Sequence, residues 1–151
     1  MFIFYVDGDA CPVKEIIKKV VDRYQLETII VSASPLKVKP PIKNVAVGNA
    51  FDGADDWIIE RIQKFDLLAT ADIELAYRAL KADAYAIDFK GTIFTDENIV
   101  DMMAKRNLMA VLRDTQFDHE KKLKKRTLKD SSVFANNLDN IIQKIKRKLK
   151  I

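Results

Sequence analysis

The chain has 151 residues, of which 48% are apolar, 32% are charged and one is a cysteine. This length and composition predict one domain over 1–151, with enough apolar residues for a sizeable core. A lone cysteine excludes an internal disulfide bond and a zinc site made of several cysteines. No basic-then-apolar leader and no apolar run of about 18 residues is found, so we expect a cytoplasmic protein that does not contact a membrane.

The formal net charge of +4 is unevenly distributed along the chain. Residues 1–112 hold 14 basic and 17 acidic side chains, whereas residues 113–151 hold 12 basic and 5 acidic ones. An acidic site beside a basic segment suits a polyanionic substrate that is bound together with metal ions. A solvated surface explains the same asymmetry, and from charge alone it is the simpler interpretation.

The opening stretch combines a buried strand with two carboxylates. Residues 2–6 are all apolar, with β-branched and aromatic side chains among them, which predicts a strand buried on both faces. Asp7 ends this strand, and Gly8 permits a tight turn that brings Asp9 close to it. Pro12 suits the first turn of a following helix. Open α/β sheets place their sites at such strand ends, while the alternative role of Asp9 is an ordinary helix cap.

The chain offers few side chains for nucleophilic catalysis. Cys11 follows the acidic turn, but His119, the only histidine, lies far along the chain in a charged segment. A cysteine nucleophile needs a nearby base. We therefore expect Cys11 to pack as a small apolar residue.

Hydrophobic periodicity alternates between amphipathic helices and buried strands. Apolar residues at i, i+3, i+4 and i+7 predict a helix over 13–24, and the apolar run 27–33 predicts a second strand. A strand, a helix and a strand within about thirty residues imply a right-handed parallel crossover. The elements expected next are a stiff proline-containing loop at 34–41, strands at 44–48 (near an edge), 67–70, 84–87 and 92–94, and helices after 52, at 72–81, from 95 and at 132–149. The predicted fold class is α/β, a three-layer α/β/α sandwich with a mostly parallel central sheet.

A second acidic cluster opens the helix after the third strand. Asp52 can cap that helix, because acidic residues in a first turn favour the helix dipole. Capping does not explain two further carboxylates, since Asp55 and Asp56 add repulsion beside Asp52. We expect one of them to face the sheet edge as a metal ligand, and we favour Asp55 over Asp56.

The fourth strand repeats the design of the first. The buried run 67–70 ends shortly before Asp72, which on its own is an ordinary helix N-cap. Parallel strands bring their carboxyl ends to one edge of a sheet. We therefore expect Asp7, Asp9 and Asp72 to meet at that edge, with Glu74 as a fourth acidic group.

Two helices and a basic segment make up the last third of the chain. Thr95 is the predicted cap of the first helix. The apolar stripe of this helix consists of Ile99, Met102, Met103, Leu108, Val111 and Leu112. Residues 115–130 lose this periodicity and form the basic segment. The final helix, at about 132–149, is predicted to bury Phe134, Leu138, Ile141, Ile142, Ile145 and Leu149.

Five motifs occur in order along the chain and together resemble a known family. They are VDGDACP at 6–12, FDGAD at 51–55, DLLATADI at 66–73, GTIFT at 91–95 and FANNL at 134–138. These motifs are similar to those of the YaiI/YqxD family of uncharacterised bacterial proteins, and the likeness covers nearly the whole chain. The family in turn looks related to PIN-like nuclease domains.

The resemblance implies an α/β/α sandwich of the PIN-like type. PIN-like domains use clustered carboxylates to hold Mg²⁺ or Mn²⁺ for phosphodiester hydrolysis. The resemblance thus implies a metal-dependent nuclease that acts on nucleic acid, with RNA as the first expectation. The chain departs from the family at Gly8, where members usually have alanine, at Asp56, where they usually have asparagine, and in its lysine-rich segment before the last helix.

The candidate site residues suit this chemistry. Mg²⁺ keeps several waters and takes a few carboxylates plus substrate phosphate, and two such ions about 4 Å apart would activate water and stabilise the leaving oxygen. We expect catalytic roles for Asp7, Asp9, Asp55 and Asp72, with Asp56 and Glu74 as further metal ligands. Candidate substrate contacts are Ser32, Lys14, Lys90, Arg113, Lys121, Lys122, Lys124 and Lys125. Surface charge is the simpler role for the basic residues among them.

Two other functions are open from the sequence. A phosphatase of the haloacid-dehalogenase type would use Asp7 as nucleophile, Asp9 as acid/base, Ser32 to hold phosphate and Asp72 to assist Mg²⁺. Against it, the chain lacks a convincing lysine-plus-acidic-pair ending and the usual threonine or valine after the DxD motif. A non-catalytic nucleic-acid-binding protein would rely on the basic residues of 121–129.

Overall fold

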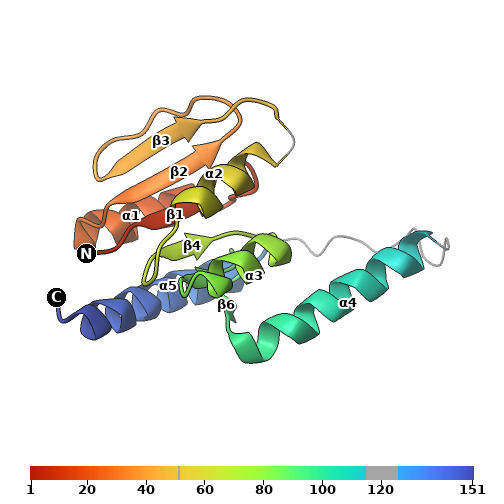
Figure 1. Ribbon diagram of the computed structural model, residues 1–151. Coiled ribbons are helices and arrows are strands. Elements are labelled where there is room, and N and C mark those ends of the chain that lie inside the picture. The colour runs from red at the N-terminus through yellow and green to blue at the C-terminus, as the bar shows by residue number, and fades with distance from the viewer. Residues whose placement is uncertain (51, 115–125) are drawn as a thin grey trace.

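Figure 1 shows the computed structural model, which describes residues 1–50, 52–114 and 126–151. Within these ranges the chain forms six strands and five helices. The strands are β1 (Phe4–Asp7), β2 (Thr28–Ser32), β3 (Ile42–Ala46), β4 (Leu67–Ala69), β5 (Tyr85–Ile87) and β6 (Ile93–Phe94). The helices are α1 (Lys14–Tyr24), α2 (Gly53–Arg61), α3 (Ile73–Lys81), α4 (Asp96–Asp114) and α5 (Leu128–Leu149). No helix of this described part combines the length and the apolar character that crossing a bilayer requires.

The strands form one sheet with the order β3-β2-β1-β4-β5-β6. Neighbouring strands are parallel except β5 and β6, which pair antiparallel. The chain moves outward from β1 to β2 and β3, and then returns to the other side of β1 to form β4 and β5. The carboxyl ends of β1 and β4 therefore flank the topological switch point, where open α/β sheets form their binding crevice.

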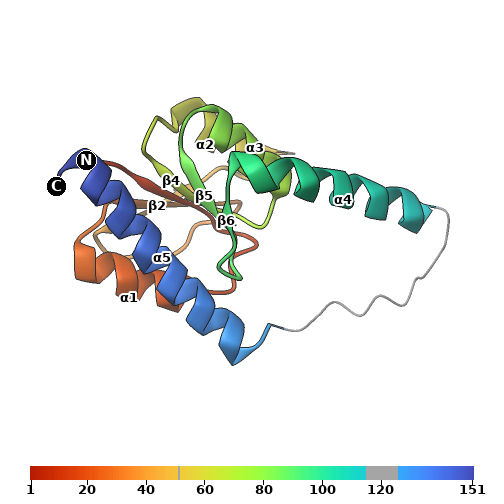
Figure 2. The ribbon, with the colours of Figure 1, turned by 90° about the horizontal axis from the view of Figure 1, so that it is seen from below.

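Helices cover both faces of the sheet, as Figures 1 and 2 show. On one face α1 and α5 pack together, with Ile17 and Phe134 in the same core. On the opposite face α2 and α3 contribute Ile58 and Leu75 to a second core. These layers confirm the predicted fold class, a three-layer α/β/α sandwich with a mostly parallel sheet.

The first strand is buried on both faces, as its sequence predicts. Phe4 and Val6 belong to the core under α1 and α5, whereas Tyr5 belongs to the core under α2 and α3. This alternation is the two-residue period of a strand. Because β1 lies between β2 and β4 and is covered on both faces, the backbone of Asp7 is held in a fixed position at the carboxyl edge of the sheet.

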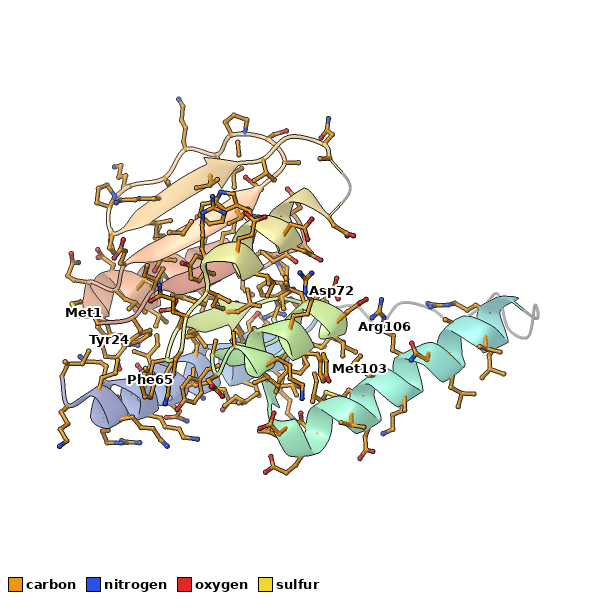
Figure 3. The ribbon with its side chains drawn as sticks, in the orientation of Figure 1. Met1, Tyr24, Phe65, Asp72, Met103 and Arg106 are labelled. Carbon is orange, nitrogen blue, oxygen red and sulfur yellow. The ribbon has the colours of Figure 1, made fainter. Side chains whose placement is uncertain are left out.

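The outer half of α4 differs from the prediction. Ile99 is buried and Met102 and Met103 pack against α3, but Leu108 and Val111 are each 58% exposed. The helix extends away from the sheet, while Met103 points back toward α3 (Figure 3). The predicted apolar stripe is therefore covered only in its first half, because periodicity shows which residues share a helix face but not whether a neighbour covers that face.

The last helix begins at Leu128, earlier than the predicted 132. Thr127 and Asp130 form a capping box, in which each side chain accepts a hydrogen bond from the backbone N–H of the other, at 3.2 and 3.0 Å. Just before it, Arg126 donates from Nη1 to the carbonyl oxygen of Phe89. The end of the predicted basic segment is therefore part of the folded body.

The connection from β2 to β3 contains no helix. Residues 33–41 return as an irregular loop, consistent with the prediction of a proline-containing loop there. Parallel strands are usually joined by a helix that covers one face of the sheet. Here the face of β2 and β3 on the α1 side is bordered by α1 and this loop, which together leave a pocket described below.

Candidate acidic site at the carboxyl edge of the sheet

Five aspartates line one shallow depression at the switch point. It has a volume of about 260 Å³ and lies among the loop after β1, the loop that joins β3 to α2, and the start of α3. The five are Asp7, Asp9, Asp52, Asp55 and Asp72, and we call this group the acidic depression. The four aspartates that the sequence predicts to be catalytic thus line the same depression.

Thr70, which follows β4, links the Asp7 carboxylate to the backbone of Asp72. Its hydroxyl group donates a hydrogen bond to Asp7 Oδ2 at 2.9 Å and accepts one from the Asp72 backbone N–H at 3.0 Å. Thr70 has no exposed surface, so this bond does not compete with solvent. The sequence places Thr70 at the end of the predicted strand 67–70 but gives no signal of its role in orienting Asp7.

Asp72 is the N-cap of α3, the simpler of its two predicted roles. Its Oδ1 atom accepts hydrogen bonds from the N–H groups of Glu74 at 2.9 Å and Leu75 at 3.2 Å. Figure 3 labels Asp72 at this end of α3. Both cap bonds go to Oδ1 rather than Oδ2, so capping the helix and lining the depression are compatible roles for one carboxylate.

Asp9 fastens the acidic turn to the end of β2. Its two carboxylate oxygens accept from the Ala33 N–H, at 3.2 and 3.0 Å. The alternative role as a helix cap is wrong, since Val13 occupies the N-cap position of α1 and makes no side-chain cap bond. Gly8 permits this close turn, because a Cβ atom there would come within 2.6 Å of Ile30 Cγ2.

Burial and mutual repulsion raise the pKa of two carboxyls in the acidic depression. Burial is the main cause that raises the pKa of Asp7, with Asp72 and Asp9 adding to it while the Thr70 hydrogen bond opposes it. The pKa of Asp55 rises from 3.8 to about 6 through burial and the charges of Asp72, Asp7 and Asp52, against a smaller opposite effect of Arg78. The ionised carboxylates therefore repel one another in the metal-free protein.

Asp52 is the site residue that sequence reasoning missed. The sequence predicts an ordinary cap here, but the Asp52 side chain makes no cap hydrogen bond, and the φ of 57° lies in the left-handed region. That conformation turns the carboxylate away from the capping geometry and leaves it lining the depression. The aspartate-glycine pair at the start of α2 is the sequence signal for such a turn.

Asp56 and Glu74 do not line the acidic depression. Asp56 lies 3.7 Å from Arg78 of α3, and Glu74 lies 3.6 Å from Arg106 of α4, which Figure 3 labels. Both are surface ion pairs between neighbouring helices. The preference for Asp55 over Asp56 agrees with these placements, whereas the assignment of Asp56 and Glu74 as ligands does not.

Ser32 does not line the acidic depression either. It is buried, its hydroxyl donates to the Ser34 carbonyl oxygen at 2.7 Å, and it accepts from Asn44 Nδ2 at 2.9 Å. A serine committed in this way is poorly placed to hold the phosphate of a phosphatase reaction.

The three candidate cations of the described part lie outside the acidic depression. Lys14, in the first turn of α1, donates from Nζ to the Cys11 carbonyl oxygen at 3.1 Å. Lys90 lies in the turn after β5, and Arg113 lies near the end of the projecting α4; both are exposed.

Four predicted substrate contacts, Lys121, Lys122, Lys124 and Lys125, lie outside the described residues, as does His119. Cys11 is buried in the core with α1 and α5. Burial raises the pKa of its thiol, which disfavours the thiolate that a nucleophile requires. Its placement agrees with the expected packing role.

The fit of the acidic depression to a divalent ion depends on its donors and on their spacing. Carboxylate oxygens are the ligands that Mg²⁺ and Mn²⁺ prefer. Among the described residues, however, no group of three or more His, Cys, Asp or Glu side chains is arranged to hold a metal ion. Mg²⁺ typically takes one or two protein carboxylates together with water and phosphate, so the donor set suits the ion without forming a closed cage.

Comparison with known proteins places the chain among bacterial relatives. A family model described as the uncharacterised YaiI/YqxD family matches residues 5–144. A UPF0178 protein of Rhodopseudomonas palustris is 43% identical over 146 residues, which cover 95% of this chain and 92% of the relative. A UPF0178 protein of Rhizobium meliloti is 40% identical over 147 residues, which cover 96% and 100%. No solved structure matches the chain. The chain therefore belongs to the YaiI/YqxD family.

Proposed function

We propose that this protein is a Mg²⁺- or Mn²⁺-dependent phosphodiesterase that hydrolyses nucleic acid, with RNA as the first substrate to test. The observation that carries the proposal is the acidic depression, where five carboxylates from three separate segments of the chain meet at the switch point of the sheet. The resemblance of the family to PIN-like nuclease domains supports the same chemistry. A bound divalent ion would lower the pKa of a coordinated water and neutralise charge on the scissile phosphate.

The residues of the depression have distinct roles in this proposal. Asp7 and Asp55 would provide direct ligands, because each carries a raised pKa that a cation would relieve. Thr70 would position Asp7 through the hydrogen bond to Oδ2. Asp72 would remain the cap of α3 through Oδ1 and face the ion or its waters with Oδ2. Asp9 and Asp52 would complete the negative field.

The experiment compares hydrolysis of labelled single-stranded RNA by matched variants. We expect product with Mn²⁺ or Mg²⁺ and none with a chelator. Asp7→Asn should abolish the activity. Asp56→Asn should retain it, because Asp56 belongs to the acidic cluster at the start of α2 but does not itself line the depression. Identical purification of both variants excludes a contaminating nuclease. No metal-dependent cleavage of RNA or DNA by the wild type, or full activity of Asp7→Asn, would overturn the proposal.

A further inference from the structure

The helix-free connection between β2 and β3 leaves a second pocket, larger than the acidic depression. Its volume is about 690 Å³, against about 260 Å³ for the depression. Four lysines surround it: Lys14 and Lys18 from α1, and Lys37 and Lys39 from the loop. Glu15 is the one acidic residue of its lining. We call this site the lysine pocket; its charge favours an anionic ligand.

The floor of the lysine pocket is mostly apolar, with Asn44 of β3 as the one uncharged polar residue of the lining. Ile30 of β2 and Ile42 of β3 are buried side chains at its base, and Leu36 and Val38 extend this surface along the loop. A pocket that only collected small anions would need no such floor. Positive side chains around an aliphatic surface match a ligand that joins phosphate groups to flat, weakly polar rings.

The side chain of Asn44 holds the part of the loop that borders this pocket. Asn44 of β3 donates from Nδ2 to the Ile30 carbonyl oxygen and to Ser32 Oγ, both at 2.9 Å. Its Oδ1 accepts from the Leu36 N–H at 2.8 Å. The start of the loop is therefore fixed against β2, so the pocket is preformed and does not have to be ordered by a ligand.

Two short segments connect the lysine pocket to the acidic depression. Ala33, which lines the depression and binds Asp9, is three residues before Leu36, which lines the pocket. Lys14 similarly follows the acidic turn and is bonded to the Cys11 carbonyl oxygen. Each of these two segments begins at the depression and ends at the pocket. A polyanionic chain can therefore contact both sites.

We propose that the lysine pocket binds the unpaired nucleotides of a single-stranded nucleic acid next to the phosphodiester held at the acidic depression. This inference deepens the proposed function. Its second half, the position beside the phosphodiester held at the acidic depression, rests on that function. In a duplex the bases are stacked inside and only edges are accessible, so a base cannot reach the floor formed by Ile30 and Ile42. An unpaired base can pack on that floor while the lysines contact the flanking phosphates.

The test measures binding in a chelator, so that metal plays no part. The probe is a fluorescent RNA of about twelve nucleotides, and anisotropy is recorded as salt is varied. The double variant Lys37→Ala/Lys39→Ala should bind about tenfold more weakly at low salt, with a salt slope reduced by about 1.4 if two phosphate contacts are lost. Leu36→Ser should weaken binding about threefold with the slope unchanged, because it removes a base contact and no charge.

The matched control is Lys64→Ala/Lys81→Ala, which removes two lysines that do not line the pocket. This variant should bind like the wild type, and a duplex of the same sequence should bind more weakly than the single strand. Equal losses in both double variants, or an equal affinity for the duplex, would overturn the inference. If the RNA binds as expected but no metal response is found, the proposed function fails, and with it the position beside a held phosphodiester, while the binding of unpaired nucleotides at the lysine pocket stands. If metal-dependent cleavage is found but these binding results are not, the proposed function stands and this inference fails.

Discussion

The acidic depression and the lysine pocket lie at adjoining loops of one sheet, yet they are built in opposite ways. The depression uses short aspartates on constrained backbone, where one caps a helix, one is bonded to the buried Thr70 and one fastens a turn. The pocket uses long lysines, three of which are exposed, around an apolar floor. Rigid, repelling charges suit chemistry at a fixed point, whereas flexible charges suit binding of a variable polymer.

The two regions also differ in their effect on the stability of the folded protein. Burial and, to a smaller extent, repulsion among the aspartates raise the pKa of Asp7 and Asp55. The exposed lysines of the pocket are solvated in the folded and the unfolded chain alike. The depression is therefore expected to destabilise the metal-free protein through charge repulsion, which a bound cation would relieve. The exposed lysines of the pocket are expected to cause no comparable destabilisation.

The largest expected effect is kinetic, because variants of the two regions should change different kinetic parameters. Asp7→Asn should lower kcat by about a thousandfold or more, because a ligand oxygen is lost at the reacting centre. Lys37→Ala/Lys39→Ala should raise KM with little change in kcat, since these lysines would contribute uniform binding. Steady-state kinetics on single-stranded RNA provide the measurement. A mainly kcat effect of the lysine variant would contradict the division of roles.

The next effect concerns the support of Asp7. Thr70→Val keeps the shape of the buried side chain but removes the hydroxyl that donates to Asp7 Oδ2 and accepts from the Asp72 N–H. We expect a loss of about 1–2 kcal/mol in the free energy of unfolding, because buried polar groups are left unpaired. Denaturant unfolding without metal measures it. An unchanged stability would show that Thr70 does not hold the two strand ends together.

A smaller effect should appear as a pH dependence of metal-free stability. The folded protein binds the Asp55 proton more tightly than the unfolded chain, since the pKa rises from 3.8 to about 6. Stability from this group is therefore greatest below about pH 3.8 and is lost as the pH rises from there through about 6. Burial is the main cause of the raised Asp55 pKa, the charges of Asp72, Asp7 and Asp52 add to it, and Arg78 opposes it.

The matched variant isolates this contribution. Asp55→Asn should gain about 1 kcal/mol over the wild type at neutral pH, after allowance for solvent screening. Unfolding curves at about pH 5 and pH 8 should show the larger gap between the two proteins at the higher value, because the loss begins near 3.8 and is complete only above about 6. A gap of equal size at both values would mean that ionisation of Asp55 is not its source.

The smallest expected effect distinguishes two roles of one residue. Asp72→Asn should change metal-free stability by less than about 0.5 kcal/mol, because asparagine is as good an N-cap as aspartate, whereas Asp72→Ala should lose about 1 kcal/mol. The asparagine variant should nevertheless weaken metal binding. If it binds Mn²⁺ like the wild type, Asp72 is a structural cap alone.

Sequence reasoning recovered the features that depend on local pattern. The runs 2–6 and 67–70 were recognised as buried strands, and parallel order then implied that Asp7 and Asp72 share an edge. Features that depend on tertiary packing were not recovered. The exposed half of α4 reflects the absence of a covering neighbour for Leu108 in the described chain. The lysine pocket exists because no helix joins β2 to β3, so Lys37 and Lys39 carried no signal of their own.

Asp52 shows why part of the site was missed. An aspartate before a helix is most often a cap, and only the positive φ of this residue redirects it toward the depression. Thr70 is a similar case, because its role depends on the distance between two strand ends that lie far apart in the sequence.

Calorimetric titration with Mn²⁺ tests most directly whether the acidic depression is a metal site. The wild type, Asp55→Asn and Asp56→Asn are compared, because the last two differ by one position on the same helix and only Asp55 lines the depression. Wild type and Asp56→Asn should bind Mn²⁺ with similar affinity, and Asp55→Asn should bind at least about tenfold more weakly. No binding by the wild type at about millimolar Mn²⁺, or equal weakening in both variants, would contradict this assignment.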